Sequence, residues 1–114
     1  MRCPMLFFKD NASIIFYTKP VNLHKGFELL TSIAQNELGL RLVPDLYVLF
    51  CNKKRDIIKV LYRDGENLAC WSKRIGCTLT FKYDEAMITF DQKEFTDFLK
   101  KRCFRKVGNR FKAR

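Results

Sequence analysis

The sequence predicts an α+β fold: one domain in which an antiparallel meander sheet of about five strands packs against two helices, followed by a basic C-terminal tail. The first observation is a cluster of short apolar and alternating segments between residues 46 and 90, joined by short turns that favour antiparallel pairing. The second is that apolar residues recur at helical spacing on both sides of this cluster. The third is size, because 114 residues with 47% hydrophobic side chains form one core but not two. We therefore expect a globular domain over residues 1–102 and a tail over residues 103–114.

The first strand and the first helix are predicted between residues 13 and 39. Residues 13–18 are rich in isoleucine and aromatic side chains, and Lys19-Pro20 ends the strand. Asn22 is a suitable N-cap for a helix that stops at Gly39. The apolar positions that recur along this helix are Phe27, Leu30, Ile33, Ala34 and Leu38.

The remaining strands are predicted after the turn signal Pro44-Asp45. Turn-forming residues divide this part of the chain into short apolar segments. Extended segments are expected at residues 46–51, 57–63, 68–73, 78–83 and 87–90.

A β-hairpin is predicted around Asp64-Gly65, a dipeptide typical of two-residue turns. A turn at these two residues would place Arg63 opposite Glu66 and make apolar residues face apolar residues further along. The face expected to point toward the helices carries Ile58, Val60, Tyr62 and Trp71.

The last helix is predicted to begin at Asp91, where Asp91 and Glu94 have the spacing of a capping box. Its apolar stripe consists of Phe95, Phe98, Leu99 and Cys103.

Charge is the unusual property of this composition. The formal net charge is +10, and residues 100–114 carry eight basic side chains and no acidic one, so the rest of the chain is close to neutral. An anionic partner is therefore expected, with DNA bound at low sequence specificity as the first candidate.

Two groups of cations are candidates for contacting nucleic acid. Extending the hairpin brings five of them together at one end of the sheet: Lys53, Lys54, Arg55, Lys73 and Arg74. The second group lies in a C-terminal segment that is interpreted as a disordered basic arm folding onto nucleic acid: Lys100, Lys101, Arg102, Arg105, Lys106 and Arg110. Alternatively, the first group is an ordinary solvated turn and the second a solvated helix end.

A possible anion site is predicted at His24 and Lys25, where backbone N–H groups at a helix start lie beside two cationic side chains. The alternative is a plain helix start at which Gly26 allows close packing.

No catalytic residue, cofactor or metal site is predicted. Five cysteines form no Cys-x-x-Cys pair, and His24 is the one histidine. The acidic residues fall in turns without the spacing of a two-metal cluster, and we expect a protein that is not an enzyme. The apolar run of residues 5–8 is too short for a membrane span, so we expect a cytoplasmic protein.

Several segments resemble one protein family. They are residues 21–30 (VNLHKGFELL), 46–50 (LYVLF) with 52–56 (NKKRD), 58–62 (IKVLY), the Asp64-Gly65 turn, and 71–75 (WSKRI). In order and spacing they resemble Orf2 proteins, also called TnpB, of the insertion-sequence-66 family, which are distinct from the RNA-guided nuclease of that name. Asn22, His24 and Asn67 depart from the usual residues of the family.

The resemblance implies an accessory protein of a bacterial transposable element that acts in DNA transposition, a form of DNA recombination, beside a separate transposase. It also implies that the protein is associated with the nucleoid if it binds DNA. Two functional hypotheses follow. In the first, the protein is not an enzyme, binds nucleic acid electrostatically and assists the transposase. In the second, it is a protein-interaction adaptor for the transposase with no direct nucleic-acid contact.

Overall fold

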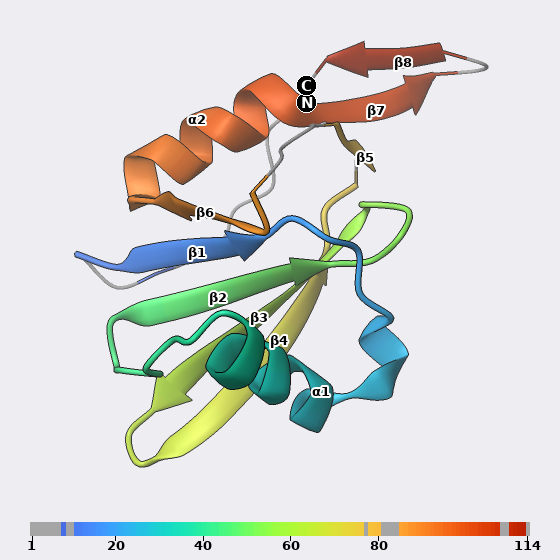
Figure 1. Ribbon diagram of the computed structural model, residues 1–114. Helices are drawn as coiled ribbons and strands as arrows, with labels where there is room; N and C mark the ends of the chain where they lie inside the picture. Colours follow the sequence, from blue (N-terminus) through green and yellow to red (C-terminus); the bar gives the residue numbers. More distant parts are fainter. Residues whose placement is uncertain (1–7, 9–10, 77, 81–84, 108–109, 114) are drawn as a thin grey trace.

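The computed structural model describes residue 8 and residues 11–76, 78–80, 85–107 and 110–113, with side chains up to residue 101. Its centre is a five-stranded sheet with the strand order β4-β3-β2-β1-β6 (Figure 1). The strands are β1 (Ser13–Tyr17), β2 (Leu46–Cys51), β3 (Ile57–Asp64), β4 (Asn67–Arg74) and β6 (Met87–Phe90).

The sheet is mixed, because β1 and β2 are parallel while the other three neighbouring pairs in it are antiparallel. Between β1 and β2 the chain forms a 3₁₀ turn (Leu23–Lys25), α1 (Phe27–Ser32) and a π-helical turn (Ile33–Glu37). A helical crossover of this kind is the usual connection between parallel strands. The prediction of an α+β sheet of about five strands with two helices is confirmed, and the parallel pair is the exception to its antiparallel meander.

The two helices cover opposite faces of the sheet, with α2 (Gln92–Arg102) above it and α1 below it in Figure 1. One cluster of buried side chains joins Ile58 and Val60 to Phe95 and Phe98 of α2. Leu61, on the other face of β3, belongs to the cluster that includes Leu30 of α1. The predicted core face of the hairpin therefore packs toward α2 alone, and the opposite face is buried as well. Every residue of β2 is buried, as expected for a strand that has a layer on each side.

The β3–β4 hairpin forms with a register two residues away from the predicted one. Asp64 pairs with Asn67, and the turn residues are Gly65 and Glu66 instead of Asp64 and Gly65. Gly65 has φ 63°, and a turn with glycine at its first central position matches the twist of the flanking strands. Because a shift of two residues preserves strand alternation, each side chain keeps the predicted face.

Helix α2 begins with the predicted capping box. The backbone N–H of Glu94 donates to Asp91 Oδ1 at 2.7 Å, and the backbone N–H of Asp91 donates to Glu94 Oε1 at 2.9 Å. Phe95, Phe98 and Leu99 are buried. The predicted strand at 78–83 is seen as β5 (Thr78–Leu79), while residues 81–84 lie outside the described part of the chain.

The C-terminal segment is not an arm without regular structure. Its backbone forms β7 (Cys103–Val107) and β8 (Arg110–Ala113), which make a second sheet with β5 in the order β5-β7-β8. The sequence signal for this hairpin is the turn-forming dipeptide Gly108-Asn109, placed between segments that carry Phe104 and Phe111.

Candidate nucleic-acid interface

The predicted cationic patch begins at the β2–β3 loop, residues 52–56, and Asn52 holds this loop in shape. Its Oδ1 accepts from the backbone N–H groups of Asp56 and Ile57, both at 3.1 Å. Its Nδ2 donates to Asp56 Oδ1 at 2.8 Å. Arg55 adopts φ 60°, a left-handed conformation that few residues other than glycine adopt. These bonds fix a tight loop to one end of the sheet. We call this end of the sheet, which carries the β2–β3 loop, the loop end.

Lys73 and Arg74 are brought to this loop by the β3–β4 pairing. Ile57 pairs with Arg74 and Ile58 with Lys73. The next backbone N–H, that of Ile75, donates to the carbonyl of Asp56 at 2.9 Å. The predicted convergence of the five cations is therefore present in the backbone, and the corrected register places Arg74 opposite Ile57, directly after the loop, instead of opposite Arg55 within it.

Asp56 forms an ion pair with Arg74, one of these cations. Arg74 Nη1 lies 3.5 Å from Asp56 Oδ2, with 70% of the Arg74 side chain and 26% of the Asp56 side chain exposed. An ion pair this open to solvent stabilises the fold by less than about 1 kcal/mol. Its larger effect is to orient the Arg74 guanidinium at the loop end.

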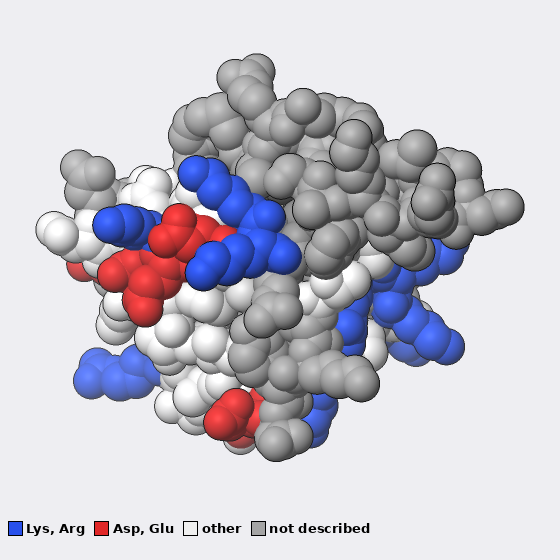
Figure 2. All heavy atoms as spheres, turned by 90° about the horizontal axis from the view of Figure 1, so that it is seen from above, with Lys and Arg blue, Asp and Glu red and all other residues white. Residues whose placement is uncertain are grey.

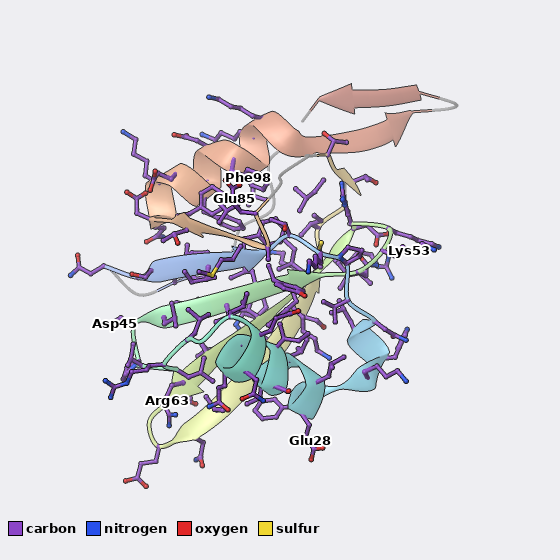
Figure 3. All side chains as sticks on the ribbon, in the orientation of Figure 1. Glu28, Asp45, Lys53, Arg63, Glu85 and Phe98 are labelled. Atoms are coloured by element: carbon purple, nitrogen blue, oxygen red, sulfur yellow. The ribbon has the colours of Figure 1, made fainter. Side chains whose placement is uncertain are left out.

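Lys53 and Lys54 are exposed, and Figure 3 shows Lys53 projecting beyond the end of the sheet. Within the described part of the chain, neither lysine forms an ion pair or a side-chain hydrogen bond. Arg55 and Lys73 are half-buried. Lys53 and Lys54 are therefore the members of the patch with the most freedom to meet an external anion.

The predicted anion site at His24 and Lys25 lies at the same end. The backbone N–H of Val21 donates to the carbonyl of Cys51 at 2.9 Å, which ties this segment to the last residue of β2. Asn22 Oδ1 accepts from the His24 N–H at 3.0 Å, as an N-cap does. Lys59 Nζ donates to the Leu23 carbonyl at 3.2 Å and fixes the segment from the sheet side.

These segments surround a hollow of about 590 Å³. It is lined by residues 20–24 from one side and by residues 52–54, 56, 57 and 74 from the other. The structure thus brings together two predicted sites that are far apart in the sequence. Lys25, Arg55 and Lys73 lie on these segments but do not line the hollow.

On the face shown in Figure 2, the described charged side chains are distributed unevenly between the two ends. In Figure 2, Lys and Arg side chains gather toward the right-hand end, whereas basic and acidic side chains are mixed at the left-hand end. Lys100 and Lys101 are exposed near the end of α2. The side chains of Arg102, Arg105, Lys106 and Arg110 lie outside the described part, so their predicted contacts remain predictions.

The backbone of the C-terminal hairpin lies beside the loop end. The N–H of Leu79 in β5 donates to the Arg55 carbonyl at 2.9 Å, and Leu79 pairs with Cys103 of β7. Figure 1 shows β7 and β8 at the same right-hand end as the β2–β3 loop. The two predicted groups of cations therefore belong to neighbouring parts of the fold.

Among the residues that the structure describes, the clearly shifted pKa values belong to two thiols and one phenol, and all three are raised. Burial raises the pKa of Cys51 to about 11, and it also raises the pKa of Cys70. Both thiols are protonated at neutral pH and are weak nucleophiles. Burial and the hydrogen bond to Glu37 raise the pKa of Tyr17 to about 12. Among the residues that the structure describes, no group of three His, Cys, Asp or Glu side chains could hold a metal ion.

Sequence reasoning missed the residues that build the frame of the site. No role was predicted for Asn52, although asparagine readily bonds to backbone groups that follow it and so forms loops of this kind. The Nζ of Lys59 donates to the Leu23 carbonyl, and this role was not predicted. No local signal marks its bond to Leu23, because the two residues meet only through the fold.

The fold and the site define a small basic protein with a mixed sheet and a cationic sheet end. Residues 12–107 match the family described as IS66 Orf2 like protein, and this match covers most of the chain. The chain therefore belongs to that family and is an accessory protein of IS66 transposition. No curated protein and no solved structure matches the chain. None of the helices in the described residues has the length and apolar character needed to cross a membrane.

Proposed function

We propose that this accessory protein binds nucleic acid electrostatically through its loop end, assists a separate transposase, and carries out no catalysis of its own. The observation that carries the proposal is the meeting of Lys53, Lys54 and Arg74 with residues 20–24 around one hollow. We call residues 20–24 the His24 segment. Exposed cations held by a fixed loop are suited to contacting phosphates in a salt-dependent way with little sequence preference.

The basic C-terminal segment would add affinity to this surface. Its candidate contacts are Lys100, Lys101, Arg102, Arg105, Lys106 and Arg110. Because β7 pairs with β5, which is bonded to the β2–β3 loop, deletion of the segment would also remove structure beside the site. Substitution of the charges is therefore the cleaner experiment for this segment.

The direct test compares two double variants of equal charge. Lys53→Gln/Lys54→Gln changes the loop end, and Arg41→Gln/Lys93→Gln changes two exposed cations at the other end of the sheet. Arg41 precedes the start of β2, which lies at the end of the sheet opposite the β2–β3 loop. Lys93 follows the last residue of β6, Phe90, which pairs with Ile14 near the start of β1 and so lies at the same end. Binding to labelled random duplex and single-stranded DNA is measured by fluorescence anisotropy at two salt concentrations.

We expect the loop-end variant to bind about tenfold more weakly at low salt. The slope of log affinity against log salt should also fall by about 1–2 for the two lost phosphate contacts. The control variant should stay close to the wild type. Equal losses in both variants would show that only net charge matters, and undetectable binding by the wild type at low salt would refute the proposal.

Exposed apolar side chains on α1 favour a second candidate function, that of a docking adaptor for the transposase. Phe27 is 39% exposed and Leu29 is 37% exposed. The adaptor function would be supported if the transposase co-purifies with this protein in the presence of nuclease and high salt. The double variant Phe27→Ser/Leu29→Ser should abolish this co-purification. Recovery of the transposase only when nucleic acid is intact would contradict it.

A further inference from the structure

The hollow at the loop end is larger than phosphate contact requires. Its volume of about 590 Å³ falls within the range of about 300–1,000 Å³ that is typical of pockets for small molecules. A surface that only touches the phosphates of a duplex needs projecting cations but no recess. The shape of the site therefore calls for a ligand with a part that enters the recess.

The lining combines two chemical characters. Lys53, Lys54 and Arg74 supply positive charge, while Val21, Leu23 and Ile57 supply apolar surface. Val21 is buried, and Leu23 and Ile57 are half-buried. A ligand that matches both the charge and the apolar surface has an anionic group next to a flat and largely apolar body. A nucleotide has this structure, with its phosphate as the anionic group and its base as the flat body.

Hydrogen bonds hold both walls of the hollow in place. Asn52 fixes the β2–β3 loop, and the bond from Val21 to Cys51 fixes the opposite segment. The carboxylate of Asp56 also lines the hollow, but it accepts from Asn52 and pairs with Arg74, which reduces its repulsion of an anion. Walls that are ordered before binding lower the entropic cost of association.

Two side chains on the His24 segment suit the recognition of a base. Asn22 Oδ1 is used as the helix cap, whereas Asn22 Nδ2 has no hydrogen-bond partner among the described residues and is able to donate to a base edge. His24 is exposed and lines the hollow, so its flat ring is available for stacking. Aromatic rings that stack on bases are the usual means of binding single strands.

Resting on the proposed function, we propose that the hollow takes one unpaired nucleotide of a single strand. The phosphate lies against Lys53, Lys54 and Arg74, and the base enters the recess beside His24. A duplex satisfies only the phosphate contacts, because its bases are paired and stacked. The protein therefore binds single-stranded DNA more tightly than duplex DNA of the same sequence.

The test uses three labelled ligands: a thymidine oligonucleotide, an abasic oligonucleotide with the same number of phosphates, and a duplex that contains the thymidine strand. Their affinities for the full chain are measured by fluorescence anisotropy at low salt. We expect the thymidine strand to bind about tenfold more tightly than the abasic strand, because base stacking adds to the phosphate contacts.

Variants of His24 locate the base. His24→Ala should reduce the affinity for the thymidine strand several-fold without changing the affinity for the abasic strand, and His24→Phe should restore it. The backbone N–H that bonds to Asn22 remains in both variants, and thermal unfolding checks that the fold is retained. If His24→Ala no longer unfolds cooperatively, the affinities for the thymidine and abasic strands are measured with Asn22→Ser instead. This variant keeps a cap oxygen but removes Nδ2.

The possible failures differ from one another. Equal affinity for the thymidine and abasic strands would overturn the nucleotide site while leaving electrostatic binding intact. Discrimination that survives His24→Ala in a folded protein would place the base elsewhere and would also overturn the proposal. If none of the three ligands binds at low salt, the proposed function fails and the nucleotide site fails with it.

Discussion

The two ends of the central sheet use basic side chains in opposite ways. At the end that carries the β3–β4 turn, Arg63 Nε donates to the Leu42 carbonyl at 2.6 Å and Nη1 donates to the Glu66 carbonyl at 3.2 Å. At the loop end, Lys53 and Lys54 project into solvent, and Asn52 supplies the bonds that shape the loop. Arg63 thus stabilises the chain around it, whereas the uncharged side chain of Asn52 takes that role at the loop end, and the two lysines there form no bond to the described residues.

The comparison shows that the number of cations does not identify a binding surface. Figure 3 shows Arg63 near the β3–β4 turn and Lys53 at the opposite end. Both residues are basic and both are near turns, but two nitrogens of the Arg63 guanidinium donate to backbone carbonyls, whereas the Lys53 ammonium donates to none of the described residues. We therefore expect substitution of Arg63 to change mainly the free energy of unfolding, and substitution of Lys53 to change mainly the affinity for DNA.

Asn52→Ala should have the largest effect on stability. It removes two acceptor contacts to backbone N–H groups and one donor contact to Asp56, all in a half-buried loop. We expect the free energy of unfolding to fall by about 2–3 kcal/mol, since each lost bond costs about 1 kcal/mol and the N–H groups keep no equivalent partner. Urea denaturation followed by circular dichroism measures the change.

Asn36→Ala is the matched control for this substitution. Asn36 is exposed and donates to Ser32 Oγ at 3.2 Å, so its loss should cost less than about 0.5 kcal/mol. If both variants lose the same free energy, Asn52 does not organise the loop. Where Asn52→Ala still folds, we expect weaker binding to DNA without any change of charge.

Arg63→Met tests the opposite end. The methionine keeps an apolar stem but removes the guanidinium that serves the Leu42 and Glu66 carbonyls. Because a hydrogen bond to a charged group contributes more than a neutral one, we expect a loss of about 1.5–3 kcal/mol. Affinity for DNA should change no more than in Arg41→Met, an exposed neighbour that loses the same charge. A marked fall in affinity with little loss of stability would reverse the roles assigned to the two ends.

The fold could be predicted from the sequence wherever local patterns determined it. The capping box at Asp91 and Glu94 and the alternation along β3 gave the correct elements and the correct faces. The turn was misplaced because Asp-Gly fits two positions of a short turn, and only pairing along the whole hairpin selects Gly65-Glu66. The parallel pairing of β1 with β2 was missed, although the order of strand, helix and strand favours it.

The part of the site that local sequence patterns determine could also be predicted. The convergence of the loop cations with Arg74 followed from the hairpin alone, so sequence pattern was sufficient. The meeting of this cluster with the His24 segment depends on the bonds of Val21 to Cys51 and of Lys59 to Leu23. These contacts join residues about thirty positions apart in the sequence, and no local pattern encodes them.

The Arg74–Asp56 pair should give the smallest effect on stability. A double-mutant cycle with Arg74→Gln and Asp56→Asn should yield a coupling of about 0–1 kcal/mol that decreases with added salt, because the guanidinium is largely exposed. The effects on DNA binding should nevertheless have opposite signs. Arg74→Gln removes a phosphate contact and weakens binding, whereas Asp56→Asn removes a negative charge from the hollow, keeps an oxygen for Asn52 Nδ2, and strengthens binding. A coupling well above this range, or a loss of affinity in both variants, would mean that the pair is a structural element like Arg63. The contrast between the two ends of the sheet would then be lost.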